Sequence, residues 1–184
     1  MTRTTSARIA GFTFLLYIAA AFSGMILLDR ASSGAGTAAK LARIAQHAAD
    51  VRIVAVLSLV CCFTALVLAV TLYRVTSAED DDLAMLALTC RAGEGILNAV
   101  SVLIPMGLLW LATTAGANAP ANALGAFLFK VQDWNTIIAA TLFAVGSTLF
   151  AYLLLRGRMF PVPLAWLGVI GSALVVVGLA AATR

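Results

Sequence analysis

Charged residues are scarce in this sequence. Only 11% of its 184 residues are charged and 62% are hydrophobic, whereas a soluble domain has about a quarter of its residues charged and about half apolar. A soluble fold of this size has too little interior to bury so much apolar surface, but a lipid bilayer covers it. The composition therefore excludes an ordinary soluble domain and predicts an integral membrane protein.

Residue types that carry catalysis or bind metals are also scarce. The chain has one histidine, His47, and three cysteines, Cys61, Cys62 and Cys90, all inside apolar runs and without a CxxC spacing. We interpret the cysteines as small apolar helix residues and expect no metal or other cofactor. No HExxH motif, phosphate-binding glycine loop or nucleophile-elbow serine occurs. No catalytic residue is therefore predicted, and no basic stripe suggests a nucleic-acid partner.

Five apolar runs are long enough to cross a hydrocarbon core of about 30 Å, which takes about 20 helical residues. The sequence thus predicts an all-α integral membrane protein, with residues 1–184 forming a single transmembrane domain, a bundle of about five transmembrane helices. The first run follows a short basic segment and is longer than the apolar region of a signal peptide, so we interpret it as a retained anchor. The runs are Ile9–Leu28, Ile53–Tyr73, Leu83–Leu111, Thr136–Leu155 and Leu164–Ala182.

The third and fourth runs differ from simple spans. The third is about 29 residues or 43 Å of helix, so it must tilt, bend near Pro105 or extend beyond the membrane. It follows the acidic segment Glu79–Asp82, which is typical of a capped helix start. A helical pattern resumes at Leu124, so the fourth helix is expected to begin outside the hydrocarbon.

A short amphipathic helix is predicted between the first two spans, over residues 37–50. Apolar residues including Leu41 and Ile44 share one face, and Lys40, Arg43 and His47 crowd the other. This period predicts a helix that lies on the membrane surface or caps the bundle. The glycine- and serine-rich residues 31–36 before it are expected to form a turn.

An arginine and a glutamate, Arg91 and Glu94, interrupt the third run. They are three residues apart, so they share a helix face and can form an ion pair. An unpaired charge at the bilayer centre costs about 2.5–3.5 kcal/mol on insertion scales, so neither side chain is expected to face lipid. The same face continues through Asn98, Ser101 and Pro105 and predicts a polar seam towards the interior of the bundle.

Two interpretations of this seam stay open. In one, the ion pair satisfies itself and fixes helix packing; in the other, the seam lines a polar cavity that binds a ligand or relays a proton. Small and hydroxyl residues on the facing helices also suit close packing, so they do not decide between the two. The candidate ligand-binding residues are Arg91, Glu94, Asn98 and Ser101, and the candidate facing residues are Tyr17, Asp133 and Thr136.

Several short segments together resemble a known family. They are Ala7-Arg8-Ile9-Ala10-Gly11 with Tyr17 downstream, Arg91-Ala-Gly-Glu94, Tyr152-Leu-Leu-Leu, Pro163 and Trp166-Leu167-Gly168-Val169. In order and spacing, over nearly the whole chain, they resemble the bacterial membrane-protein family known as domain of unknown function 4386. Many members carry an acidic residue early in the second span, where this chain has Ser58. The resemblance implies a multi-pass protein of the bacterial cytoplasmic (inner) membrane and supplies no mechanism.

Three functions are compatible with these features. The leading hypothesis is a non-enzymatic bundle that binds or passes a small polar or amphipathic molecule at the Arg91/Glu94 seam. The alternative is a structural or accessory protein that assembles through small-residue helix faces, such as Gly168, Gly171 and Gly178 in the fifth run. An enzyme acting on a lipid-like substrate comes third. Membrane lipids, a second copy or another membrane protein are the expected partners, and the basic N-terminus favours a cytoplasmic N-terminus.

Overall fold

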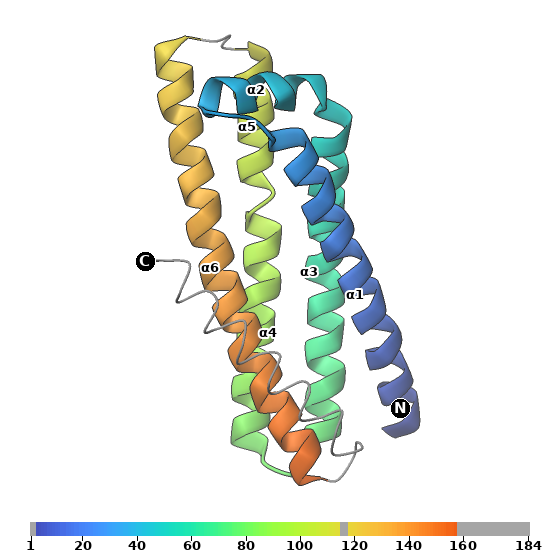
Figure 1. The fold of residues 1–184 in the computed structure, drawn as a ribbon. Helices are drawn as coiled ribbons and strands as arrows, with labels where there is room; N and C mark the ends of the chain where they lie inside the picture. Colours follow the sequence, from blue (N-terminus) through green and yellow to red (C-terminus); the bar gives the residue numbers. More distant parts are fainter. Residues whose placement is uncertain (1–2, 115–117, 158–184) are drawn as a thin grey trace. The chain divides into compact units, whose positions relative to one another are not determined.

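The computed structural model describes residues 3–114 and 118–157, and this part of the chain is helical without a strand (Figure 1). Four stretches in it are long and apolar enough to cross a membrane: Gly11–Ser32, Ala48–Thr76, Asp81–Thr114 and Ala119–Arg156. This confirms the predicted all-α membrane fold. The fifth predicted span, Leu164–Ala182, and its glycine-lined face lie outside the described residues. The helices are α1 Arg3–Ser32, α2 Thr37–Gln46, α3 Ala48–Thr76, α4 Asp81–Val100, α5 Leu103–Thr114 and α6 Ala119–Arg156.

The described residues form two compact units. The first contains residues 3–16, 63–96 and 137–157, and the second contains residues 17–62 and 97–136. Helices α1, α3, α4 and α6 each contribute to both units, whereas α2 and α5 belong to the second. The Arg91 and Glu94 side chains lie in the first unit.

The start of α4 is capped as the acidic segment predicts. The Asp80 side chain accepts a hydrogen bond from the backbone N–H of Leu83, at 3.2 Å, which satisfies one of the donors left open at a helix start. Its other carboxylate oxygen lies 3.3 Å from Nη1 of Arg156, at the end of α6. In the same turn, the Tyr73 hydroxyl donates to Asp81 at 2.8 Å. The acidic residues thus connect the ends of three helices.

The third predicted span is two helices rather than one, because the ladder of hydrogen bonds is interrupted at Ser101 and Val102. Pro105 has no N–H to donate to the Ser101 carbonyl, which accepts a bond from the N–H of Ile104 instead, at 3.1 Å. The N–H of Val102 likewise turns to the Ala99 carbonyl, at 3.3 Å. The bend expected near Pro105 therefore occurs as a tight turn just before the proline.

The predicted amphipathic helix caps a core in the second unit. Its apolar residues Leu41 and Ile44 are buried, and α2 packs against α5. Gly125 in α6 allows a close approach, since a Cβ there would lie 3.1 Å from side-chain atoms of both Leu41 and Thr37. The helix ends at Gln46 instead of residue 50, because the chain turns at His47 and Ala48 begins α3. The buried cluster consists of Ala31, Leu41, Ile44, Val51, Ile104, Leu108, Leu109, Leu111 and Ala121.

The turn between α1 and α2 depends on glycine. Gly36 has a φ of 87°, a backbone conformation that other residues rarely adopt. The Ser32 hydroxyl donates to the Leu28 carbonyl at 2.7 Å, at the end of α1. The predicted turn is therefore confirmed in its second half, while α1 extends through Ser32.

Helix α6 is longer than a single membrane crossing. Its 38 residues correspond to about 57 Å of helix, almost twice the hydrocarbon thickness. Lys130 and Asp133 form an ion pair at 3.6 Å whose side chains are 70% and 63% exposed, and Trp134 beside them is also exposed. Charged residues that are exposed lie outside hydrocarbon, with tryptophan at the boundary. The exposed ion pair thus lies in the first half of α6, the half against which α2 packs.

Candidate functional site

One face of α4 positions the two intramembrane charges. Ala84, Ala87, Arg91, Glu94 and Gly95 are buried on this face. The first four are spaced by three and four residues and Gly95 follows Glu94 directly, so all five lie on one side of the α-helix. The two alanines are small enough to bring neighbouring backbones close. The face thus places a long basic side chain and a carboxylate in a tightly packed interior.

Arg91 and Glu94 form a buried ion pair. Nη1 of Arg91 lies 3.0 Å from Oε2 of Glu94, and the two side chains are only 2% and 3% exposed. Arg91 is one of the largest fully buried side chains of the described chain. A pair in so apolar an environment neutralises both charges locally, which an arginine or a glutamate alone could not do. The predicted pairing is therefore present.

A phenylalanine from α6 covers the arginine. Cζ of Arg91 lies 4.5 Å from the centre of the Phe143 ring, within the range of a cation–π contact. Such contacts contribute about 0.5–1 kcal/mol at exposed sites and about 2 kcal/mol or more when desolvated. The guanidinium therefore has a carboxylate from its own helix and an aromatic face from another.

Gly146, one turn along α6, makes room for this arrangement. A Cβ at this position would lie 2.9 Å from Cγ of Arg91 and 3.1 Å from the carbonyl oxygen of Ala87. It would also lie 3.1 Å from Cβ of Cys90. Since two of these three atoms belong to the backbone or lie next to it, they have little freedom to move. The absence of a side chain at Gly146 therefore allows α4 and α6 to meet at Arg91.

The other two seam residues, Asn98 and Ser101, lie where α4 ends. Both are half-buried. The Ser101 hydroxyl donates to the Asn98 carbonyl at 2.7 Å, so it supports the turn before α5. Arg91 and Glu94 are thus enclosed in the first unit, whereas Asn98 and Ser101 lie in the second unit beside the break between α4 and α5.

The candidate facing residues have local partners or are only partly buried. Asp133 is exposed and pairs with Lys130, and the exposed Thr136 donates its hydroxyl to the Gln132 carbonyl at 2.9 Å. Tyr17 is half-buried in α1, and its carbonyl lies 4.0 Å from Sγ of Cys61.

Sequence reasoning missed Phe143 and Gly146, the two α6 residues that contact Arg91. A signal for them is present in the sequence. Ala139, Phe143, Gly146, Phe150 and Leu153 follow one another at intervals of four and three residues, which marks one helix face. Four of the five are buried, and Phe143 is half-buried. A glycine within such an apolar stripe is typical of close helix packing in membranes.

Comparison with known proteins identifies a family and no individual relative. The family model described as "Domain of unknown function (DUF4386)" matches residues 9–183, nearly the whole chain. No curated protein and no solved structure gives a significant match. The chemistry of the site therefore has to be derived from its own geometry.

The close approach at Gly146 can be tested with two glycine-to-alanine substitutions. Gly146→Ala should lower the free energy of unfolding by about 1–3 kcal/mol, because the added methyl overpacks the contact between α4 and α6. Gly107→Ala is the matched control, since a Cβ there would make only an ordinary van der Waals contact, 3.6 Å from Cδ1 of Leu128. Unfolding of the purified protein in detergent micelles measures both. Equal effects of the two substitutions would show that the contact at Gly146 is not as tight as described.

Proposed function

This chain belongs to the DUF4386 family, and we propose that it acts as a structural or accessory membrane protein whose Arg91–Glu94 pair fixes the packing of its transmembrane helices. The observation that carries this proposal is the enclosure of the pair. The two side chains are 2% and 3% exposed and in contact with each other. Phe143 and Gly146 of α6 close the space around Arg91.

The energetics of buried charge favour packing over ligand binding at this end of the seam. A ligand that binds Arg91 would have to separate it from Glu94, leaving a buried carboxylate without its counter-charge. Breaking a buried ion pair in this way costs about 3–5 kcal/mol. The ligand would also displace Phe143 from the guanidinium. If α6 stays packed against Arg91 and no ligand enters, Arg91 and Glu94 remain paired with each other.

Assembly would then use the outer helix faces. Helix α1 has a row of exposed apolar side chains, which lipid or another transmembrane helix covers. Gly11 on the same helix has open space where a Cβ would stand, so another backbone can come close there. We infer that the partner is a second copy or another membrane protein, with membrane lipids on the remaining surface. The exposed α1 residues include Phe12, Leu15, Phe22, Met25 and Ile26.

A double-mutant cycle tests the packing role of the ion pair. Arg91→Met and Glu94→Leu should each destabilise the protein by about 3–5 kcal/mol, because each leaves one buried charge unpaired. The double variant should recover most of this loss, since it buries no charge. Unfolding in detergent micelles gives the four free energies of the cycle.

The exposed pair Lys130–Asp133 provides the matched control, because it has the same spacing of three residues on a helix. Its cycle, Lys130→Met and Asp133→Leu, should give a coupling of about 0–1 kcal/mol. If the Arg91/Glu94 double variant loses as much stability as the two single variants combined, the pair is not the source of the packing energy.

The break between α4 and α5 favours a second candidate function, the binding or passage of a small polar or amphipathic molecule. Non-helical backbone at membrane depth is tolerated where protein buries it or where it lines a cavity, and broken helices form substrate sites in many transporters. Here the half-buried Asn98 and Ser101 border the break. In this function, the ligand would bind at Asn98 and Ser101, while Arg91 and Glu94 stay paired.

Native mass spectrometry of the full chain tests this second function. It predicts a co-purifying small molecule that Asn98→Leu reduces at least tenfold, because the amide is lost from the seam. Asn135→Leu, at another half-buried asparagine, should leave the signal unchanged. An empty spectrum, or the same loss in both variants, would contradict binding at the seam and leave the accessory role.

The proposed location is the bacterial cytoplasmic membrane, with the N-terminus in the cytoplasm. The basic N-terminus supports this orientation. A cysteine introduced as Ser33→Cys, in the exposed turn after α1, should then react with a membrane-impermeant maleimide added to intact cells. Ala78→Cys, exposed after α3, should react only after the cells are permeabilised. The reverse pattern would show that the chain has the opposite orientation.

A further inference from the structure

Four basic residues on and next to α2 form no ion pair within the described part of the chain. Arg30, Lys40, Arg43 and Arg52 lie at the end of α1, on α2 and at the start of α3, and within the described chain no carboxylate pairs with any of them. Asp50 is engaged with His47, at 3.0 Å between Oδ2 and Nδ1. We call Arg30, Lys40, Arg43 and Arg52 the basic collar. Their charge is therefore available to a ligand.

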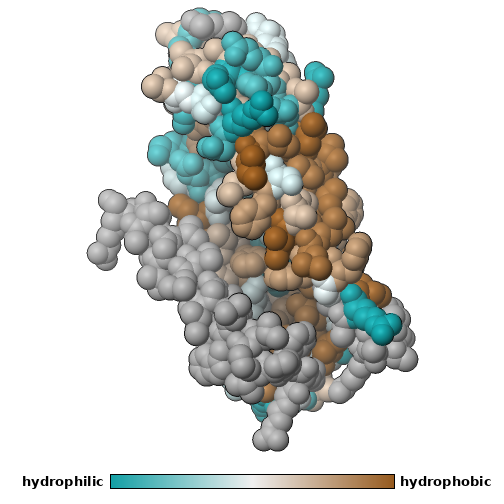
Figure 2. All heavy atoms as spheres, turned by 45° about the vertical axis from the view of Figure 1, so that its right-hand side comes forward, coloured by the Kyte–Doolittle hydropathy of each residue, from teal (hydrophilic) through white to brown (hydrophobic). Residues whose placement is uncertain are grey.

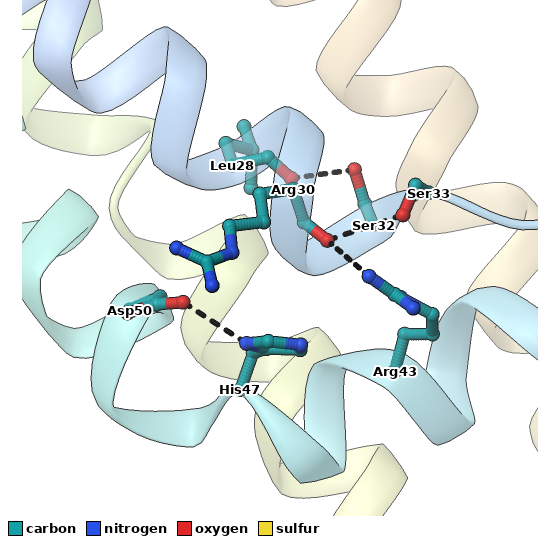
Figure 3. A network of polar contacts seen from close by, with 7 residues as sticks. All are labelled: Leu28, Arg30, Ser32, Ser33, Arg43, His47 and Asp50. Atoms are coloured by element: carbon teal, nitrogen blue, oxygen red, sulfur yellow. Dashed lines mark hydrogen bonds and ion pairs between the residues drawn. The ribbon is translucent and has the colours of Figure 1, made fainter.

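Contacts within the protein hold part of this collar in place (Figure 3). Nη2 of Arg43 donates to the Arg30 carbonyl at 3.3 Å, which connects α2 to the end of α1. The Nε–H of Arg43 is buried and has no acceptor in the described part of the protein. Lys40 lies over the Phe129 ring, 5.0 Å from its centre. Figure 3 shows the Arg30 side chain extending to the side on which His47 and Asp50 lie.

Arg30 and Arg52 lie at a similar level on neighbouring helices. Helix α1 approaches α3 at Gly24, where a Cβ would contact Leu57. Arg30 is six residues beyond Gly24 and Arg52 five residues before Leu57, which corresponds to about 9 Å and 7.5 Å along the two antiparallel helices. Both arginines are exposed. The two exposed guanidinium groups therefore place positive charge at one level of the second unit, where a phosphate group is attracted to them.

The apolar surface next to the collar indicates that this phosphate belongs to a lipid. Ile26 lies one turn before Arg30 on α1, and Val56 one turn after Arg52 on α3. Ile26 is 62% exposed and Val56 61%. Figure 2 shows hydrophilic residues gathered around α2, with hydrophobic residues on the helices next to them. A molecule with an anionic head and long acyl chains matches both surfaces, whereas a soluble anion uses only the first.

We propose that the basic collar binds the headgroup of an anionic phospholipid, with the headgroup beside the exposed Arg30 and Arg52 and the acyl chains along Ile26 and Val56. The apolar face of α2 is buried in the protein's own core, so α2 presents its basic face to the headgroup region. Arg43 and Lys40 add the positive charge of α2. This site is independent of the role proposed for Arg91 and Glu94.

The test compares lipids of equal chain length on the full-length protein. In native mass spectrometry, phosphatidylglycerol should bind at least tenfold more tightly than phosphatidylcholine. Arg30→Gln/Arg52→Gln should reduce this preference to about twofold or less. Within the described residues, neither arginine side chain forms a hydrogen bond or an ion pair, and thermal unfolding of the variant in detergent verifies that it is folded.

Two controls distinguish lipid binding at the collar from a general effect of positive charge and from the binding of a free anion. Arg8→Gln/Arg74→Gln removes the same charge from two exposed arginines outside the collar, and it should leave the lipid preference unchanged. Inorganic phosphate should fail to compete with phosphatidylglycerol at equal concentration. The proposal is wrong if both double variants lose the preference equally, if neither does, or if inorganic phosphate displaces the lipid.

Discussion

A charge inside a bilayer has to be satisfied by the protein itself, because hydrocarbon offers neither water nor counter-ions. Arg91 meets this requirement through Glu94, one turn along its own helix, and through the face of Phe143. The arrangement requires the backbones of α4 and α6 to come close, which Gly146 permits. In the first unit, Arg91 and Glu94 of α4 therefore meet Phe143 and Gly146 of α6 at a single contact between the two helices.

Charges in the second unit are handled differently. Lys130 and Asp133 pair in an exposed position, where the interaction has little effect on stability. The basic residues around α2 have no carboxylate partner within the described chain, which is inexpensive only where water or anionic headgroups are present. One short chain thus contains an enclosed ion pair on α4 and, around α2, basic residues without a carboxylate partner in the described part of the chain. Helix α2 makes the second arrangement possible, because its apolar residues Leu41 and Ile44 fill a core of their own.

Hydropathy and residue spacing predict the features of this structure that depend on interactions between residues close together in the sequence. Hydropathy predicts the four long helical stretches of the described chain, and a spacing of three residues predicts the pairing of Arg91 with Glu94. The sequence predicts a break near Pro105 but not its exact position, because Pro105 prevents one hydrogen bond but does not determine which residues leave the helix. The boundary at His47 is not predicted, since the amphipathic pattern continues across the turn into α3.

The residues that contact Arg91 from α6 cannot be predicted from the sequence of a single helix. Sequence reasoning looks for the residues facing Arg91 among polar and hydroxyl side chains such as Asp133 and Thr136. The observed contacts are an aromatic ring and a glycine. Glu94 already supplies the counter-charge, so α6 needs only a ring that packs on the guanidinium, Phe143, and a residue without a side chain next to the arginine stem, Gly146. Which face of α6 meets α4 follows from the packing of several helices together, so periodicity alone does not specify it.

The glycine opposite Arg91 also restricts how this protein can change in evolution. As long as position 91 carries the long stem of an arginine, a side chain at position 146 has no room, so neither residue can be replaced freely. A chain that lost Arg91 would gain a cavity that a larger residue at position 146 fills, and it would no longer need Glu94. Positions 91, 94 and 146 should therefore vary together among relatives, as one inherited unit formed by residues far apart in the sequence.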